Sequence, residues 1–324
     1  MSALARRLPY LSEADQALPV LAALEGLRPG TLLTDDGVPL ALFEAGTPGR
    51  PVVLLVNALG VSVVLLAALA QALARDYHVL LWESRGLPDL HACDPARDLS
   101  VARQARDAAQ VLDAAGGRAH AVVAYCSGAN TAVHGLAHGL LRAGRLLIAS
   151  PSMVLPGVAQ QTDYQRTMLP MWVKVAQEGQ RYAALVRLLL QKSPPAGADA
   201  TSRALLAVNA LPFASDASTH RYALLQAACQ AEDWHALLPR VDVPARVLHG
   251  EQDDLIHLES ARAVAEGLGR GSFLALPDAG HFGVFQSRAL HEAAIAFLGS
   301  PLADTPVPLP HDTEGARHVH DGQR

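Results

Sequence analysis

A cysteine occupies the point at which a predicted strand runs directly into a predicted helix. The segment 119–132 reads AHAVVAYCSGANTA and carries Cys126 at this junction. A strand-to-helix turn this sharp strains the backbone of its central residue and presents that side chain at the end of the sheet. The turn also requires small residues two positions to either side, where this sequence has Ala124 and Gly128. The pattern therefore predicts that Cys126 is a nucleophile.

Residue size decides between this cysteine and the serine beside it. With Ser127 as the nucleophile, Tyr125 and Ala129 would occupy the two small positions, and a tyrosine does not fit there. A lone cysteine at a helix start is commonly a small buried hydrophobe. A catalytic role for Cys126 therefore requires an acid and a base elsewhere in the sequence. The remaining cysteines, Cys93 and Cys229, belong to no motif, and we predict that they are inert.

Two later segments supply an acid and a base. After the predicted strand RVLHG, the spacing from Gly250 selects Asp253, with Asp254 as the alternative. After LALP, the run Asp-Ala-Gly-His ends at His281, and the interval from Asp253 leaves room for one helix and one strand. In such a set the histidine is general base and acid, while the aspartate orients the imidazole and stabilises its cation.

This order of nucleophile, acid and histidine resembles that of the α/β-hydrolase superfamily, over about residues 30–299. The resemblance implies an α/β fold with a mostly parallel central sheet, helices on both faces and an inserted helical lid. It also implies an oxyanion hole made by two backbone N–H groups, those of Ser127 and Leu59. The loop around Leu59 reads Asn-Ala-Leu-Gly where the family usually has His-Gly-x-Gly, so Ala58 is the alternative donor.

A cysteine in place of the family's usual serine changes the expected chemistry. The helix N-terminus and a neighbouring histidine both favour the thiolate of Cys126. Its acyl-enzyme would be a thioester, so taking an acyl group from another thioester is nearly isoenergetic, and the group can pass on to a thiol, an amine or water.

Polyhydroxyalkanoate synthases and dienelactone hydrolases share this cysteine, but the elbow resembles most the cysteine aminoacyltransferases and thioesterases of non-ribosomal peptide assembly. That resemblance implies acyl or aminoacyl transfer, or thioester hydrolysis. The partner would be an acyl or peptidyl carrier protein or a coenzyme A thioester.

Two other classes of function are open at this point. The same three residues suit a hydrolase of a small ester or lactone, which would use water as a faster acceptor than a thiol. A non-catalytic binding protein is disfavoured because all three positions hold competent residues. The sequence contains no Walker loop, Rossmann fingerprint or metal-binding cluster, so we expect no bound cofactor and no metal.

Alternating strand and helix patterns surround these residues. The Asp-Gly pair at 36–37 predicts a hairpin over 31–44. Continuous apolar strands then alternate with amphipathic helices, which predicts a parallel sheet covered on both faces. The predicted strands are 52–56, 78–83, 119–125, 145–150, 243–250 and 271–277, and the predicted helices are 61–74, 98–115, 128–143, 258–268 and 287–298.

A run of consecutive helical patterns interrupts this alternation and divides the chain. We predict a helical lid over 153–238, inserted into an α/β-hydrolase core of 29–152 and 239–299. Residues 1–28 are predicted to be a helical N-terminal extension. The Pro-rich, polar segment 300–324 is predicted to be a disordered tail.

Four further residues have a predicted role near the site. Tyr125, Trp172 and Trp234 are candidates for lining the substrate pocket, with ordinary packing as the alternative for each. The segment Trp-Glu-Ser-Arg-Gly at 82–86 is predicted to act structurally, through a hydrogen-bond network of Arg85.

The composition excludes several classes of protein. The 324 residues are 50% hydrophobic with a net charge of −5, which argues against a disordered chain and against a nucleic-acid binder. Asn57 and Gly60 interrupt the apolar stretch 51–73, so a strand followed by a helix explains it better than a membrane span. Three cysteines and no convincing targeting segment lead us to expect a cytoplasmic protein with reduced thiols.

Overall fold

The computed structural model describes residues 24–87, 94–190 and 199–301. Most of the predicted N-terminal extension, nearly all of the predicted tail, and Cys93 lie outside the described residues. Within them, no helix is long and apolar enough to cross a membrane.

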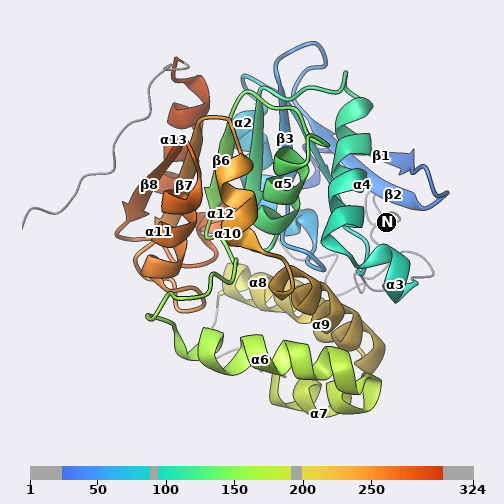
Figure 1. The fold of residues 1–324 in the computed structure, drawn as a ribbon. Helices are drawn as coiled ribbons and strands as arrows, with labels where there is room; N and C mark the ends of the chain where they lie inside the picture. Colours follow the sequence, from blue (N-terminus) through green and yellow to red (C-terminus); the bar gives the residue numbers. More distant parts are fainter. Residues whose placement is uncertain (1–23, 88–93, 191–198, 302–324) are drawn as a thin grey trace, which may run out of the picture.

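An 8-stranded sheet forms the centre of the molecule, with the strand order β1-β2-β4-β3-β5-β6-β7-β8 (Figure 1). The strands are β1 (Arg28–Leu33), β2 (Pro39–Ala45), β3 (Val52–Val56), β4 (His78–Trp82), β5 (Ala121–Tyr125), β6 (Leu146–Ala149), β7 (Ala245–Gly250) and β8 (Gly271–Leu276). β1 pairs antiparallel with β2 and β2 with β4, while all other neighbours are parallel. The predicted hairpin and mostly parallel sheet are confirmed.

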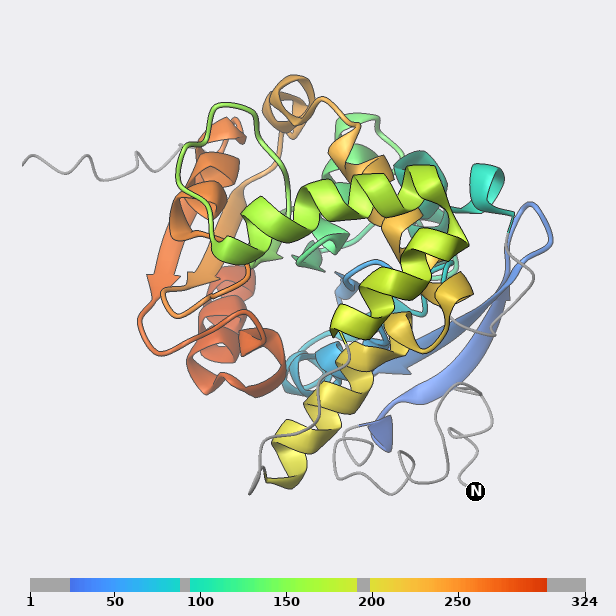
Figure 2. The same cartoon turned by 90° about the horizontal axis from the view of Figure 1, so that it is seen from below.

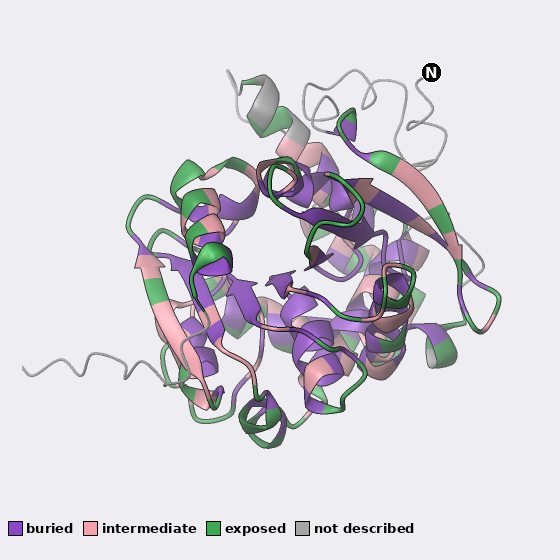
Figure 3. Cartoon of the chain, turned by 90° about the horizontal axis from the view of Figure 1, so that it is seen from above, coloured by how far each residue is buried: buried purple, intermediate pink, exposed green. Residues whose placement is uncertain are grey.

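Helices cover both faces of this sheet, as predicted. Apolar side chains of α4 (Val101–Asp113), α5 (Gly128–Ala137) and α11 (Leu258–Gly267) share one buried cluster with the sheet. Those of α2 (Ala67–Leu73) and α13 (Arg288–Gly299) share another. Burial on both faces explains why the middle strands are continuously apolar, and Figure 3 shows these strands as buried ribbon. Three short helices complete the core: the 3₁₀ helix η3 (Val63–Leu66), α3 (Pro95–Asp98) and α12 (Gly283–Gln286).

Consecutive helices follow β6 and lie across the edge of the sheet where the parallel strands end (Figures 1 and 2). They are α6 (Asp163–Glu178), α7 (Gln180–Leu190), α8 (Ala200–Ala210), η4 (Leu211–Phe213), α9 (Asp216–Gln230), α10 (Trp234–Leu237) and η5 (Leu238–Arg240). We refer to residues 163–240 as the lid. α6 begins later than the predicted start at 153. A capping box of Thr162 and Gln165 fixes its first turn, and the residues before it form a turn at Pro156-Gly157 and then irregular chain instead of helix.

One predicted helix is shorter in the structure. The pattern over 128–143 indicated a single helix, but α5 ends at Ala137. Gly139 follows in the left-handed region with a φ of 69°, a conformation that ends helices and that glycine adopts without strain. The apolar residues after it, including Leu141, pack into the core from a loop, which is why the apolar pattern continues past the helix end.

A buried ion-pair network ties the hairpin to the rest of the sheet, as predicted for Arg85. The guanidinium has no exposed surface and contacts three carboxylates: Asp107 at 2.6 Å, and Asp36 and Asp98 at 2.7 Å each. Asp36 lies in the β1–β2 turn and Asp107 on α4, so one side chain joins segments far apart in the sequence. Hydrogen bonds from Arg85 hold the pKa of Asp36 well below its usual range, whereas burial raises the pKa of Asp107.

Replacing Arg85 should destabilise the fold. An Arg85→Met variant leaves Asp98 and Asp107 buried without their main partner, so we expect the free energy of unfolding to fall by about 3–5 kcal/mol in urea titrations. Arg288→Met is the control, because Arg288 is exposed and, among the described residues, forms an ion pair only with Glu292 one helical turn away. Its unfolding midpoint should match that of the wild type. Equal midpoints for the two variants would contradict the role given to Arg85.

Candidate active site

Cys126 lies at a strained turn between β5 and α5. Its φ is +50°, in the left-handed region that a residue with a Cβ occupies at a cost of about 1–3 kcal/mol. Its N–H donates to the Ala149 carbonyl of β6, and its own carbonyl accepts from the N–H of Ser152. A Cβ at Gly128 would overlap the carbonyl oxygens of Val56 and Asn57. The small residue predicted at 128 is therefore required by the contact between α5 and the loop after β3.

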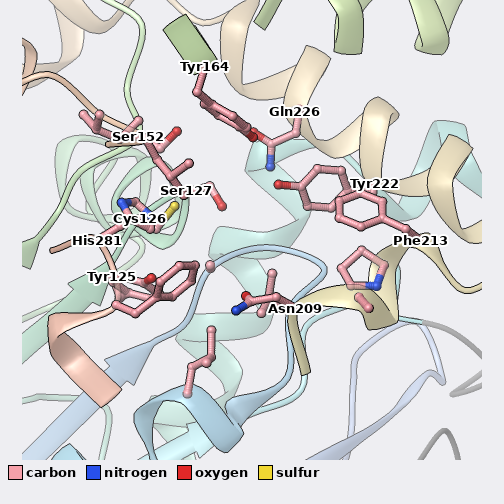
Figure 4. A pocket seen from close by; sticks show the side chains of 18 of the residues that line it. Tyr125, Cys126, Ser127, Ser152, Tyr164, Asn209, Phe213, Tyr222, Gln226 and His281 are labelled. Atoms are coloured by element: carbon pink, nitrogen blue, oxygen red, sulfur yellow. The ribbon is translucent and has the colours of Figure 1, made fainter. Parts of the chain in front are cut away.

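The structure brings Asp253 and His281 together beside this cysteine. Asp253 follows β7 and His281 follows β8, so both side chains reach the same edge of the sheet. His281 Nδ1 lies 2.9 Å from Asp253 Oδ2, and the imidazole also hydrogen-bonds the Cys126 sulfur. Figure 4 shows the imidazole next to the sulfur at the wall of a cavity. These are the contacts expected of a nucleophile, a base and an orienting acid.

Backbone donors fix the carboxylate of Asp253. Its Oδ1 accepts the N–H groups of Leu255 at 2.9 Å and Ile256 at 2.8 Å, which leaves Oδ2 for the histidine. The alternative acid, Asp254, is exposed and makes no contact with His281. The buried His249 also holds this loop in place. Its Nε2 donates to the carbonyl of Ile256, the residue whose N–H binds Asp253, at 3.0 Å.

The electrostatics of the three residues favour an imidazolium. Burial of His281 opposes its protonation, but the negative charge of Cys126 and the hydrogen bond to Asp253 outweigh it and raise its pKa to about 10. For Asp253, burial favours the neutral acid, but the hydrogen bond from His281 and its positive charge lower the pKa of the carboxyl. The arrangement therefore supports a protonated His281 next to the sulfur, with an ionised Asp253 behind it.

The oxyanion hole requires a correction. The predicted donor Leu59 N–H is already bonded to Ser127 Oγ at 2.9 Å, and Leu59 does not line the cavity. Ala58, the alternative, does line it, and its N–H has no acceptor within the described part of the chain. The Ser127 N–H is likewise without an acceptor there, and Ser127 also lines the cavity. Ala58 and Ser127 are therefore the candidate donors in the cavity wall.

A cavity of about 340 Å³ lies between the triad and the lid. Its wall includes Cys126, His281, Tyr125 and Trp172, so two of the three candidate aromatic residues line it. Trp234 does not, which corrects that prediction: its ring is buried in the core and its Nε1 donates to the Cys229 carbonyl at 2.9 Å.

Nearly half of the residues in the cavity wall come from the lid, and sequence reasoning singled out only Trp172 among them. Ser152 precedes the lid, and the polar lid residues that line the wall are Tyr164, Asn209, Tyr222 and Gln226. No short spacing marks these residues, because they meet only when α6, α8 and α9 pack together. Among the described residues, no cluster of His, Cys, Asp or Glu is suited to hold a metal ion.

The family follows from a match over three quarters of the chain. The sequence profile described as "Alpha/beta hydrolase family" matches residues 53–296. The chain belongs to this family. The matched range runs from β3 to α13 and includes Cys126, Asp253 and His281.

Solved structures share this fold at low sequence identity. A hydrolase from Pseudomonas aeruginosa PA01 is 24% identical, with a TM-score of 0.66 over 84% of this chain and 99% of that one. The enol-lactonase from Burkholderia xenovorans LB400 is 22% identical, with a TM-score of 0.65 over 84% and 100%. A putative aryl esterase from Burkholderia cenocepacia is 18% identical, with a TM-score of 0.65 over 84% and 98%. None of the curated proteins matched the sequence.

The raised pKa of His281 makes stability depend on pH. The imidazole binds its proton more tightly when folded, so its contribution is complete below about pH 6.5 and is lost as the pH rises towards 10. In Asp253→Asn this contribution shrinks, so we expect the unfolding free energy to change less between pH 7 and 9.5 than in the wild type. The difference should not exceed about 1.4 kcal/mol per pH unit.

The control for this measurement is Asp254→Asn. It removes one charge from the adjacent, exposed position without touching His281. Its urea midpoints should follow the wild-type pH dependence. If Asp253→Asn showed the same pH dependence as this control, the coupling between Asp253 and His281 would be refuted.

Proposed function

We propose that this α/β hydrolase performs acyl chemistry through a covalent acyl-cysteine at Cys126. The observation that carries the proposal is the strained Cys126, presented next to a histidine that is itself held by a buried aspartate. Activated nucleophiles have this arrangement of nucleophile, base and orienting group.

The residues suggest the following sequence of steps. The Cys126 thiolate attacks the carbonyl carbon of a thioester, and the oxygen that becomes negative is stabilised by the N–H groups of Ala58 and Ser127. The tetrahedral intermediate collapses, the bond to the leaving thiol breaks, and His281 gives that sulfur its proton. An acceptor thiol, amine or water then loses a proton to His281 as it attacks the acyl-cysteine. The bond between the acyl carbon and the Cys126 sulfur breaks, and Cys126 leaves as the thiolate beside the protonated His281.

The cysteine supports thioesters as the donors. Exchange of an acyl group between two sulfurs conserves the bond type, so the first step runs without a large change in free energy. We therefore propose acyl or aminoacyl transfer, or thioester hydrolysis, from a carrier-protein or coenzyme A thioester, as in the cysteine enzymes of non-ribosomal peptide assembly. A thiolate nucleophile also suits a reducing cytoplasm.

Hydrolysis of a small ester or lactone is the second candidate. It is supported by the family match and by the fold shared with an enol-lactonase and a putative aryl esterase. The same residues would act, with an alkoxide as the leaving group and water as the acceptor. The two candidates differ in the preferred acceptor: the first expects a thiol or amine to discharge the acyl-cysteine faster than water does.

Intact-mass measurement tests the acyl-cysteine directly. After incubation with a panel of loaded carrier proteins and acyl-coenzyme A thioesters, the wild type should gain the mass of the acyl group. Cys126→Ala should not gain it, because the sulfur that forms the bond is absent. Adding a thiol, an amine or water alone then shows which acceptor removes the adduct fastest.

Cys229→Ala is the matched control for this measurement. Cys229 is buried, and burial raises the pKa of its thiol, so it should not react. This variant should keep the full adduct. A wild type that stays unmodified across the panel, or an adduct that persists in Cys126→Ala, would refute the proposal.

A further inference from the structure

The cavity wall contains the amide of a mostly buried glutamine that has no hydrogen-bond partner among the described residues. Gln226 lies on α9, is only 6% exposed and lines the cavity. Within the described residues, neither its amide nitrogen nor its amide oxygen makes a hydrogen bond. Figure 4 shows this side chain turned into the cavity, beside Tyr164 and Tyr222. Because the amide faces the cavity, a ligand there can supply the hydrogen bonds that the described residues do not.

Two hydroxyl groups stand next to this amide. Tyr222 precedes Gln226 by one turn of α9, so both side chains share one face of the helix. Tyr164 reaches the same place from α6, where its hydroxyl accepts from Trp172 Nε1 at 3.4 Å and hydrogen-bonds Tyr222. We call Tyr164, Tyr222 and Gln226 the lid polar patch. It offers donors and an acceptor side by side in a wall that is otherwise mainly apolar.

The charges around the cavity disfavour an anion. No lysine or arginine is among the described residues that line it, and the histidine in the wall, His281, is already hydrogen-bonded to Asp253. Burial raises the pKa of Tyr164 and Tyr222, and the negative charge of Cys126 raises both further. A negative group at the patch would therefore have no free cation beside it, while a neutral polar group needs none.

We infer that Gln226, with Tyr164 and Tyr222, binds an amide group of the substrate. An amide offers one N–H donor and one carbonyl acceptor, which complement the carbonyl and the NH₂ of a glutamine side chain. A carboxylate of the same shape would find no free cation in the described cavity wall and is disfavoured. This inference deepens the proposed function, because it names a group that the acyl donor carries.

Binding is measured in the Cys126→Ala background, where no acyl-cysteine forms, so that the inference is tested even if the proposed chemistry fails. The ligands are three thioesters of equal shape whose acyl chains end in an amide, an isopropyl group or a carboxylate, each made in a series of spacer lengths. The amide-ended ligand should bind about tenfold more tightly than the isopropyl-ended one, as expected for satisfying a buried amide. The carboxylate-ended ligand should bind least.

The position of the amide in the substrate is resolved by a second pair of ligands. In these, the amide or the isopropyl group stands in the thiol half of the thioester instead of the acyl half. A preference in the first set places the recognised amide in the acyl group, and a preference in the second set places it in the leaving arm. No preference for the amide in either set would overturn the inference.

Gln226→Met and Gln230→Met form a matched pair of variants. Both residues lie on α9, but the Gln230 amide donates to the Leu169 carbonyl at 3.1 Å and does not line the cavity. Gln226→Met should abolish the preference for the amide and leave the melting temperature unchanged or higher, since it removes an unpaired amide. Gln230→Met should keep the preference and lower the melting temperature. The opposite pattern would show that Gln226 is structural and would overturn the inference.

Discussion

The left-handed backbone of Cys126 is the constraint on which the rest of the site depends. The strain persists because the turn is held from both sides: β6 accepts its N–H, and α5 contacts the loop after β3 so closely that residue 128 has no room for a side chain. Ala58 and Ser127, which flank that contact in sequence, both line the cavity next to Cys126. One packing requirement therefore holds the strained turn and brings the loop after β3 to the same wall of the cavity.

Two buried charge systems then hold the loops around this turn. Arg85 anchors the loop after β4 against the hairpin and α4. In that loop, the Ser84 hydroxyl accepts a hydrogen bond from the Gly60 N–H, and the Glu83 carboxylate accepts one from the Val63 N–H. These bonds hold the segment that follows Ala58. On the other side, Asp253 is held by two backbone donors and holds His281 in turn. Arg85 and Asp253 are both buried with hydrogen-bond partners, which fixes the positions of the loops on the two sides of the turn.

The lid supplies part of the cavity wall, whereas Cys126, Asp253 and His281 come from the core. The lid helices supply an apolar wall with few polar groups, a composition typical of sites that bind small neutral molecules. Trp172 stacks on Phe213 and meets Tyr222 edge-on, which fixes the aromatic part of the wall. Against this packed background, an unpaired Gln226 is a local loss of stability, and such losses are concentrated where proteins bind ligands.

The sequence alone predicted the succession of strands along the chain and the three residues Cys126, Asp253 and His281 that the fold brings together. Local patterns encode both: apolar runs mark strands, and Gly-x-x-Asp, Ala-Gly-His and the small residues around Cys126 are short-range signals. Only the tertiary structure decided that the Leu59 N–H is not free, since it donates to the Ser127 hydroxyl. The tertiary structure also decided that Trp172 lines the cavity while Trp234 packs in the core. It places Tyr164 of α6 and Gln226 of α9 in the same cavity wall. These outcomes depend on how the lid helices pack on one another and on the sheet, and no periodicity along the chain records that packing.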